Sequence, residues 1–264
     1  MFPVISDLPG NPAITHGLFV LLGLSVGYWV FHREVKKANA WDDRFIYMSV
    51  GIAVGGALGE RIGSVAGAVA SSGVDSVVDA WINGGRSILG GLAGAYIGAI
   101  LGKRASGYPG RTGDYFAPAI ALGLAVGRIG CFLTEAPGRP TGATWGITTP
   151  PASLDLLPGC PGCAAGVPMH PSMLYEIVFL LVAYIVIQRY KGRITAPGET
   201  LVLFLAAYAL FRFGVEFTRA NPPDIWGLTR SQVFIASLSP IFIFKLVQQA
   251  RRGTYSQLWN AQHK

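Results

Sequence analysis

Seven apolar segments, each near the length that crosses a lipid bilayer, recur along this chain of 264 residues. The hydrocarbon core requires about 20 predominantly apolar residues per helix. Each segment is predicted to be helical, because a lone strand leaves its backbone hydrogen bonds unsatisfied in lipid. The third segment is the shortest, and it could extend back through Trp81. The segments are Thr15–Phe31, Phe45–Ala70, Ser87–Gly102, Tyr115–Leu133, Met173–Gln188, Thr200–Arg219 and Gln232–Val247.

The composition supports an all-α integral membrane protein. Charged residues make up 13% of the chain, about half the share in ordinary soluble domains, and its 35 glycines allow close helix packing in lipid. We expect one polytopic membrane domain over residues 1–250, with external loops around 71–86 and 134–172, and a polar cytoplasmic tail over 251–264. The net charge of +7 does not indicate a nucleic-acid partner, because no basic face with interleaved aromatic residues is present.

Basic residues alternate between the connections. They are frequent around residues 32–37, 103–111, 188–193 and 245–252, whereas residues 71–85 contain no Lys or Arg. By the positive-inside rule the basic connections are cytoplasmic, which places the N-terminus outside and the C-terminus inside. Seven spans agree with this parity.

Charged residues within these spans are predicted to lie at one depth, toward the outer leaflet. A charge at mid-helix costs about 2.5–3.5 kcal/mol on insertion scales, so each one is a candidate functional residue. Buried ion pairs that only fix helix register, or Arg side chains that reach toward headgroups, are the alternative interpretation. Arginines nevertheless outnumber carboxylates at this depth, and a surplus of guanidinium in a dry cleft favours a bound phosphate. The arginines are Arg61, Arg86, Arg128, Arg139, Arg212 and Arg219; the carboxylates are Glu60, Glu135, Glu176 and Glu216.

Five short motifs resemble, in order, those of the bacterial prolipoprotein diacylglyceryl transferases. Residues 127–139 resemble the family signature Gly-Arg-Ile-Gly-Asn-Phe-Ile-Asn-Gly-Glu-x-x-Gly-Arg, and residues 170–176 resemble His-Pro-Ser-Gln-Leu-Tyr-Glu. Residues 208–219 resemble Tyr-x-x-Phe-Arg-x-x-Val-Glu-Phe-x-Arg, while residues 59–63 and 84–91 match two glycine-rich motifs; Gln232 also falls at a family position.

This resemblance implies transfer of the diacylglyceryl group of phosphatidylglycerol to the lipobox cysteine of preprolipoproteins, in the bacterial cytoplasmic (inner) membrane. The implied partners are phosphatidylglycerol, the preprolipoprotein signal peptide and membrane lipid, with no cofactor and no metal. Arg128 and Arg212 are expected to stabilise the departing phosphate, and Glu135 and His16 to serve the catalytic step. The expected substrate-binding residues are Arg61, Arg86, Gly138, Arg139, His170, Tyr175, Glu176, Tyr208, Glu216, Arg219 and Gln232.

Two departures from the family pattern bear on activity. The histidine that precedes a Gly-Gly pair in the third span is Leu89 here, and the signature asparagine is Cys131. We therefore hypothesise that His16 substitutes as the base, although a histidine at a helix start is also common without such a role. A paralogue with another acceptor, or a non-catalytic lipid-binding protein, remains an alternative.

Two further cysteines, Cys160 and Cys163, fall in the predicted long external loop. An oxidising compartment permits a disulfide there, and we favour a disulfide that stabilises the loop over a role in redox chemistry.

Overall fold

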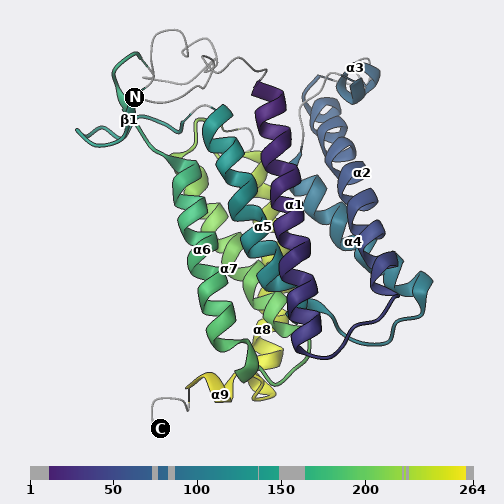
Figure 1. Cartoon of the computed structure of the whole chain (residues 1–264). Helices are drawn as coiled ribbons and strands as arrows, with labels where there is room; N and C mark the ends of the chain where they lie inside the picture. Colours follow the sequence, from purple (N-terminus) through teal and green to yellow (C-terminus); the bar gives the residue numbers. More distant parts are fainter. Residues whose placement is uncertain are drawn as a thin grey trace. The chain divides into compact units, whose positions relative to one another are not determined.

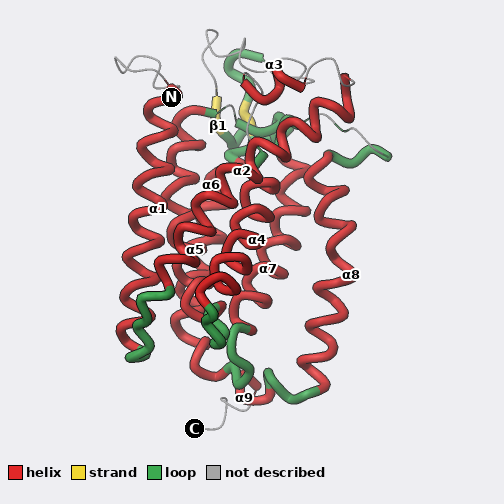
Figure 2. Tube along the Cα trace, turned by 90° about the vertical axis from the view of Figure 1, so that its right-hand side faces the viewer, coloured by secondary structure: helices red, strands yellow, loops and turns green. Residues whose placement is uncertain are grey.

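The computed structural model describes residues 12–72, 77–82, 87–135, 137–148, 164–221, 223 and 226–259. Within them the secondary structure is mainly helical (Figures 1 and 2), with one two-stranded sheet in which β1 (Ile147–Thr148) pairs antiparallel with β2 (Pro168–Met169). The chain divides into two compact units, residues 1–37 with 111–264 and residues 38–110. Each unit is described by itself below.

All seven predicted segments contain a long helix. Six helices are long and apolar enough to cross a membrane, by length and composition: Ile14–Lys37, Phe45–Ala66, Gly113–Thr134, Ser172–Arg193, Glu199–Thr218 and Arg230–Arg251. The chain is thus a multi-pass membrane protein. The remaining predicted span, within α4 (Ile88–Ser106), is helical but is not among the six. Its glycines and the basic pair Lys103 and Arg104 lower its hydropathy.

The helix α4 does not extend back through Trp81, so that expectation is wrong. Ser87 is its N-cap, with extended backbone and a side chain that accepts a hydrogen bond from Gly90 N. Such a cap satisfies an otherwise unpaired amide and marks the residue at which the helix begins. Trp81 belongs to a separate short helix, α3 (Val77–Ile82).

The smaller unit is built on α2 (Phe45–Ser72) and α4, which pack side by side through glycine (Figure 1). A Cβ added to Gly55 would lie 2.3 Å from Gly94 O, and one added to Gly59 would lie 2.2 Å from Gly90 O. No side chain fits between backbones this close, so small residues here are a condition of the packing, as expected for helices in lipid.

The larger unit is centred on α5 (Gly113–Thr134). This helix packs against α1 (Pro12–Lys37), α6 (Ser172–Tyr190) and α7 (Glu199–Val215), and α7 in turn packs against α8 (Arg230–Arg251). The short helices are η3 (Lys191–Arg193), η4 (Glu216–Thr218) and α9 (Ser256–Trp259). At the basic end of this unit, Glu34 of α1 pairs with Lys191 and accepts a hydrogen bond from Gln188 at 3.0 Å.

Part of the predicted polar tail folds back onto this basic end. Thr254 is buried, and its carbonyl accepts a hydrogen bond from Thr195 N at 3.4 Å. Tyr255 Oη donates to Glu199 Oε1 at 2.7 Å. The first residues of the tail are therefore part of the packed unit.

Candidate active site

The opposite end of the larger unit buries a three-helix contact between Arg128 of α5, Glu176 of α6 and Tyr208 of α7. Arg128 Nη2 lies 2.7 Å from Glu176 Oε1. Its N–H does not point along that line, so the contact is an ion pair rather than a hydrogen bond. Tyr208 Oη donates to the same oxygen at 2.5 Å. The side chains of Arg128 and Glu176 are 4% and 0% exposed. Removing either partner of an ion pair this deeply buried would leave an uncompensated charge and destabilise the fold.

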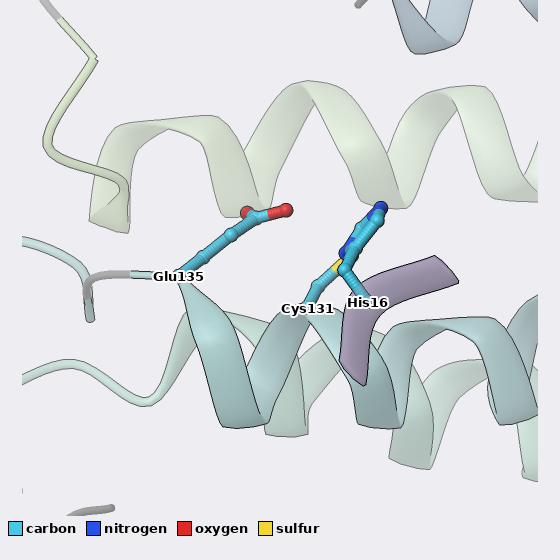
Figure 3. Close-up of side chains that lie close together, drawn as sticks. All are labelled: His16, Cys131 and Glu135. Atoms are coloured by element: carbon cyan, nitrogen blue, oxygen red, sulfur yellow. The ribbon is translucent and has the colours of Figure 1, made fainter. Parts of the chain in front are cut away.

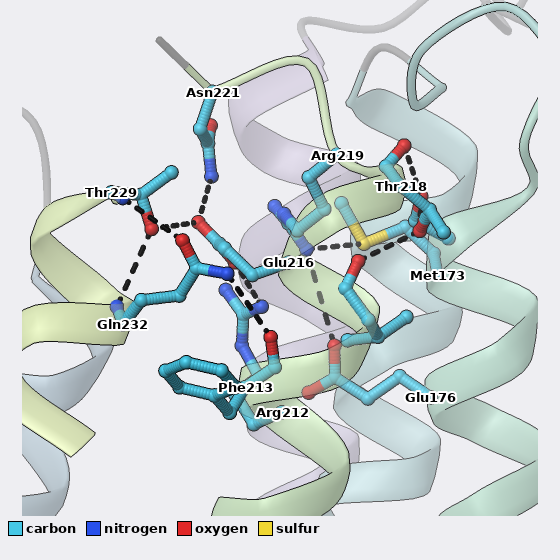
Figure 4. A network of polar contacts seen from close by, with 12 residues as sticks. Met173, Glu176, Arg212, Phe213, Glu216, Thr218, Arg219, Asn221, Thr229 and Gln232 are labelled. Atoms are coloured by element: carbon cyan, nitrogen blue, oxygen red, sulfur yellow. Dashed lines mark hydrogen bonds and ion pairs between the residues drawn. The ribbon is translucent and has the colours of Figure 1, made fainter. Parts of the chain in front are cut away.

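A second buried ion pair lies at the end of α7, where Arg212 contacts Glu216 one helical turn later. Figure 4 shows how Glu216 Oε1 is held from two other segments: Asn221 Nδ2 donates to it at 2.7 Å and Thr229 Oγ1 at 3.0 Å. A carboxylate that accepts several hydrogen bonds is fixed in position, and it fixes the guanidinium paired with it.

The start of α8 is tied into the same network. Thr229 and Gln232 form a capping box, in which each side chain bonds the other residue's backbone N–H. Gln232 Nε2 also donates to Phe213 O of α7 at 3.2 Å. The capping box thus defines the start of α8, and Gln232 holds this start against α7.

Arg219, just beyond η4, is less buried than Arg128 and Arg212, and its ionic partners lie farther away. Its Nη2 lies 3.5 Å from Glu135 Oε2, and its Nη1 lies 4.0 Å from Glu176 Oε2. The positive charges of Arg212 and Arg128 are close enough to repel the Arg219 guanidinium. An anion bound beside Arg219 would reduce this repulsion.

The signature loop after α5 is held by backbone contacts to the same end of the unit. Gly138 N donates to His170 O at 2.8 Å, and Arg139 N donates to Thr218 O at 2.8 Å. A Cβ on Gly138 would lie 2.0 Å from Thr218 O, so no side chain fits. His170 Nδ1 lies 3.1 Å from Tyr175 Oη. The loop therefore positions Arg139, whose Nη2 donates to Asn221 O at 3.3 Å.

The structure thus gathers most of the predicted site residues into one cluster, where arginines outnumber carboxylates by one. The residues gathered are Glu135, Gly138, Arg139, His170, Tyr175, Glu176, Tyr208, Arg212, Glu216, Arg219 and Gln232, together with Arg128. His16, on α1, contributes its ring 4.0 Å from the Cys131 sulfur on α5, three residues after Arg128.

Two predicted residues are not part of this cluster as described. Arg61 belongs to the smaller unit, where its Nη1 donates to Trp81 O at 3.1 Å. Arg86 lies outside the described residues, as do Cys160 and Cys163. An apolar groove of about 450 Å³ also lies in the smaller unit, lined by Ile62, Val65, Ala66, Val69 and Trp81.

Sequence reasoning missed Thr229 and Asn221, both partners of Glu216. Thr229 had a signal, because a Thr followed by Gln three residues later is the capping-box pattern at the start of an apolar run. Asn221 had none, since its contact depends on how the chain turns after Arg219.

This chain is similar to known proteins over most of its length. The family model described as prolipoprotein diacylglyceryl transferase matches residues 3–247. Three similar proteins are each named phosphatidylglycerol–prolipoprotein diacylglyceryl transferase. The protein from Solidesulfovibrio magneticus is 31% identical over 251 residues, which is 90% of this chain and 89% of that protein. The protein from Glaesserella parasuis is 30% identical over 218 residues, 80% and 77% of the two chains.

A third relative, from Bordetella parapertussis, is 37% identical over 149 residues, so this match spans about half of each protein, 55% and 52% respectively. The family match covers nearly the whole chain, and the resemblance drawn from the short motifs is confirmed. The chain therefore belongs to the prolipoprotein diacylglyceryl transferase family.

Proposed function

We propose that this protein transfers the diacylglyceryl group of phosphatidylglycerol to the lipobox cysteine thiol of preprolipoproteins. Family membership and the names of its relatives support this activity. The observation that carries it is the gathering of buried Arg128 and Arg212 with the largely buried Arg219 in one cluster that has a net positive charge. Such a cluster suits a substrate whose reacting bond ends in a phosphate.

In the proposed reaction the acceptor thiolate attacks the glycerol carbon that bears the phosphate. A carbon–sulfur bond forms, the carbon–oxygen bond breaks, and the phosphate oxygen takes the bonding electron pair and leaves as glycerol phosphate. Negative charge on that oxygen grows toward the transition state, where fixed guanidiniums in a dry site stabilise it most.

Arg128 and Arg212 carry this role in our proposal. Each is already held by one carboxylate, and a guanidinium has five N–H donors, more than one carboxylate can accept. The paired carboxylates thus set the direction of each guanidinium without using all its donors.

The acceptor thiol must lose its proton, because the thiolate is the nucleophile. We propose His16 as the group that takes it, with Glu135 nearby to stabilise the resulting charge. The substrate-binding role is proposed for Arg61, Arg86, Gly138, Arg139, His170, Tyr175, Glu176, Tyr208, Glu216, Arg219 and Gln232.

We further propose seven spans, α4 included, in a single membrane domain with its N-terminus outside and its tail cytoplasmic. Basic residues at the C-terminal ends of α1, α4, α6 and α8 support this orientation. It puts the arginine cluster at the outer leaflet of a bacterial cytoplasmic membrane, where phosphatidylglycerol and an exported signal peptide are both accessible.

The test is complementation of a bacterium depleted of its own transferase, combined with mass spectrometry of a model lipoprotein. We expect growth and the diacylglyceryl adduct with the wild-type chain, and neither with Arg212→Ala. Absence of both with a well-inserted wild-type protein would overturn the proposal. Release of glycerol phosphate without an adduct would point instead to a different acceptor.

The role of His16 has its own test. His16→Ala should lower transfer by about 100-fold or more, the range for removal of a general base. Full activity in that variant would exclude His16 as the base and leave the arginine roles unaffected.

A further inference from the structure

Three side chains with metal-ligating atoms meet between α1 and α5: His16, Cys131 and Glu135 (Figure 3). Cys131 and Glu135 are four residues apart, which places them on the same face at the end of α5. His16 reaches this face from the start of α1, with its Nδ1 4.0 Å from Cys131 Sγ. One ligand atom from each residue lies within 4.8 Å of the others.

The backbone fixes how closely these ligands approach. A Cβ added to Gly130 would lie 2.6 Å from Phe19 Cβ and 3.5 Å from His16 O, and one added to Gly23 would lie 2.6 Å from Gly123 O. The two helices are therefore in backbone contact along their length. The His16 and Cys131 side chains are held at near-ligating distance by helix packing, not by a flexible loop.

The donor set is one that transition metals prefer. Thiolate and imidazole favour Zn²⁺ and similar ions over Mg²⁺ or Ca²⁺, and a carboxylate commonly completes such a site. Tetrahedral zinc with ordinary bond lengths separates sulfur and nitrogen ligands by about 3.6 Å. The observed 4.0 Å needs a shift of only a few tenths of an ångström.

Neighbouring charges are compatible with a bound cation. The thiolate and the Glu135 carboxylate together balance a divalent ion. Arg128 Nη1 lies 3.6 Å from Cys131 Sγ, but Arg128 is also paired with Glu176. Arg219 faces one Glu135 oxygen, Oε2, at 3.5 Å, and a carboxylate has a second oxygen for a metal. The Glu135 side chain is 36% exposed, which gives the ion a route of entry.

We propose that His16, Cys131 and Glu135 bind a divalent transition metal ion of the zinc class, with a fourth position left for water or another ligand. Cys131 distinguishes this chain from the family signature, which has asparagine there. The proposal has a consequence that rests on the proposed function: a metal on the His16 ring nitrogen removes that nitrogen as a base, so zinc inhibits transfer.

The test uses the full-length protein purified in detergent, in a Cys160→Ser/Cys163→Ser background so that Cys131 is the remaining thiol. Zn²⁺ is titrated against a chromophoric chelator, and Co²⁺ is used as a spectroscopic substitute. We expect one ion per chain and a near-ultraviolet thiolate-to-cobalt charge-transfer band. Cys131→Ser and Cys131→Asn should lose the band and at least about 100-fold in zinc affinity, more than loss of a supporting partner costs.

Equal zinc affinity in the Cys131 variants and their parent would overturn the site, as would cobalt binding without the charge-transfer band. Binding is measured without lipid or acceptor, so it stands apart from any failure of transfer. Inhibition is then compared at the same free zinc concentration, one that fills the site of the parent protein, with each variant measured relative to its own activity without metal. Inhibition that persists in Cys131→Asn would overturn the regulatory consequence.

Discussion

The α2–α4 pair of the smaller unit and the α5–α8 group of the larger unit are held together in different ways. In the smaller unit, α2 and α4 meet through glycine backbones, and the Arg44–Asp42 ion pair beside the start of α2 is partly exposed. In the larger unit, α5, α6, α7 and α8 converge on buried ion pairs and hydrogen bonds. Glycine contact can stabilise a helix pair by close packing alone. Charged side chains within membrane helices are costly, so their presence indicates a functional role in addition to packing.

That contrast predicts where substitutions affect both stability and activity. A change in the glycine contact should alter packing alone. A change in the charge network should lower both stability and transfer activity. A compensating substitution should restore the stability but not the activity.

The largest effect is expected for Arg128→Ala, which removes the closer of the two ionic partners of the buried Glu176. Breaking such a pair costs about 3–5 kcal/mol, and losing a transition-state donor lowers the rate by about 100- to 1,000-fold. Unfolding free energy in mixed micelles and the transfer rate are both measured.

The matched control for this change is Arg128→Ala/Glu176→Ala. The double variant should recover much of the lost stability but none of the transfer activity. Recovery of transfer along with stability would mean that Arg128 has only a structural role.

Gly94→Ala is expected to come next and to test the other side of the contrast. Its added Cβ would lie 2.1 Å from Gly55 O, so α2 and α4 must separate, at a cost of about 1–3 kcal/mol in unfolding free energy. Gly56→Ala is the control, because its Cβ meets Ala95 Cβ at an ordinary 3.6 Å. Equal stability of the two variants would contradict glycine contact as the basis of this helix pair.

A smaller effect, about 1–2 kcal/mol, is expected for Thr229→Val, which removes the N-cap of α8 and a hydrogen bond to Glu216. Thr229→Ser keeps the hydroxyl and should stay close to wild type in the same unfolding measurement. If serine is as damaging as valine, the methyl group rather than the hydroxyl holds α8 in place.

The smallest effect, about 1 kcal/mol, is expected for Tyr255→Phe, which removes the hydrogen bond to Glu199. Burial and Glu199 raise the pKa of Tyr255 above its ordinary value of 10.0, so the folded state favours the neutral phenol. This contribution is complete below pH 10 and is lost as the pH rises above it. The stability difference between wild type and variant should therefore shrink at high pH, and a constant difference would contradict the assignment.

Much of the fold follows from local pattern. Apolar length and backbone satisfaction dictate each long helix, and glycine spacing in the second and third segments is consistent with their close pairing. The start of α4 was harder to place, because it is set by the side-chain cap of Ser87 and a second apolar stretch around Trp81 lies only a few residues before it. Hydropathy averages over a window and does not detect a single capping hydroxyl.

The candidate site was also partly predictable. Intramembrane charge alone marked Arg128, Arg212 and Glu216, because such residues are expensive in lipid wherever they occur. The pairing of Arg128 with Glu176, and of Asn221 and Thr229 with Glu216, joins residues 5 to 48 positions apart in the sequence. Periodicity describes one helix at a time and says nothing about which faces of two helices meet.

The sequence by itself determined the membrane class, the helical segments and the family, because these depend on local composition and short ordered motifs. Tertiary packing alone brings His16 to Cys131 and Glu135, and it leaves Arg219 less tightly paired than Arg128 and Arg212. The physical reason is that ligation and charge balance depend on distances of a few ångströms between helices, and those distances are set by packing.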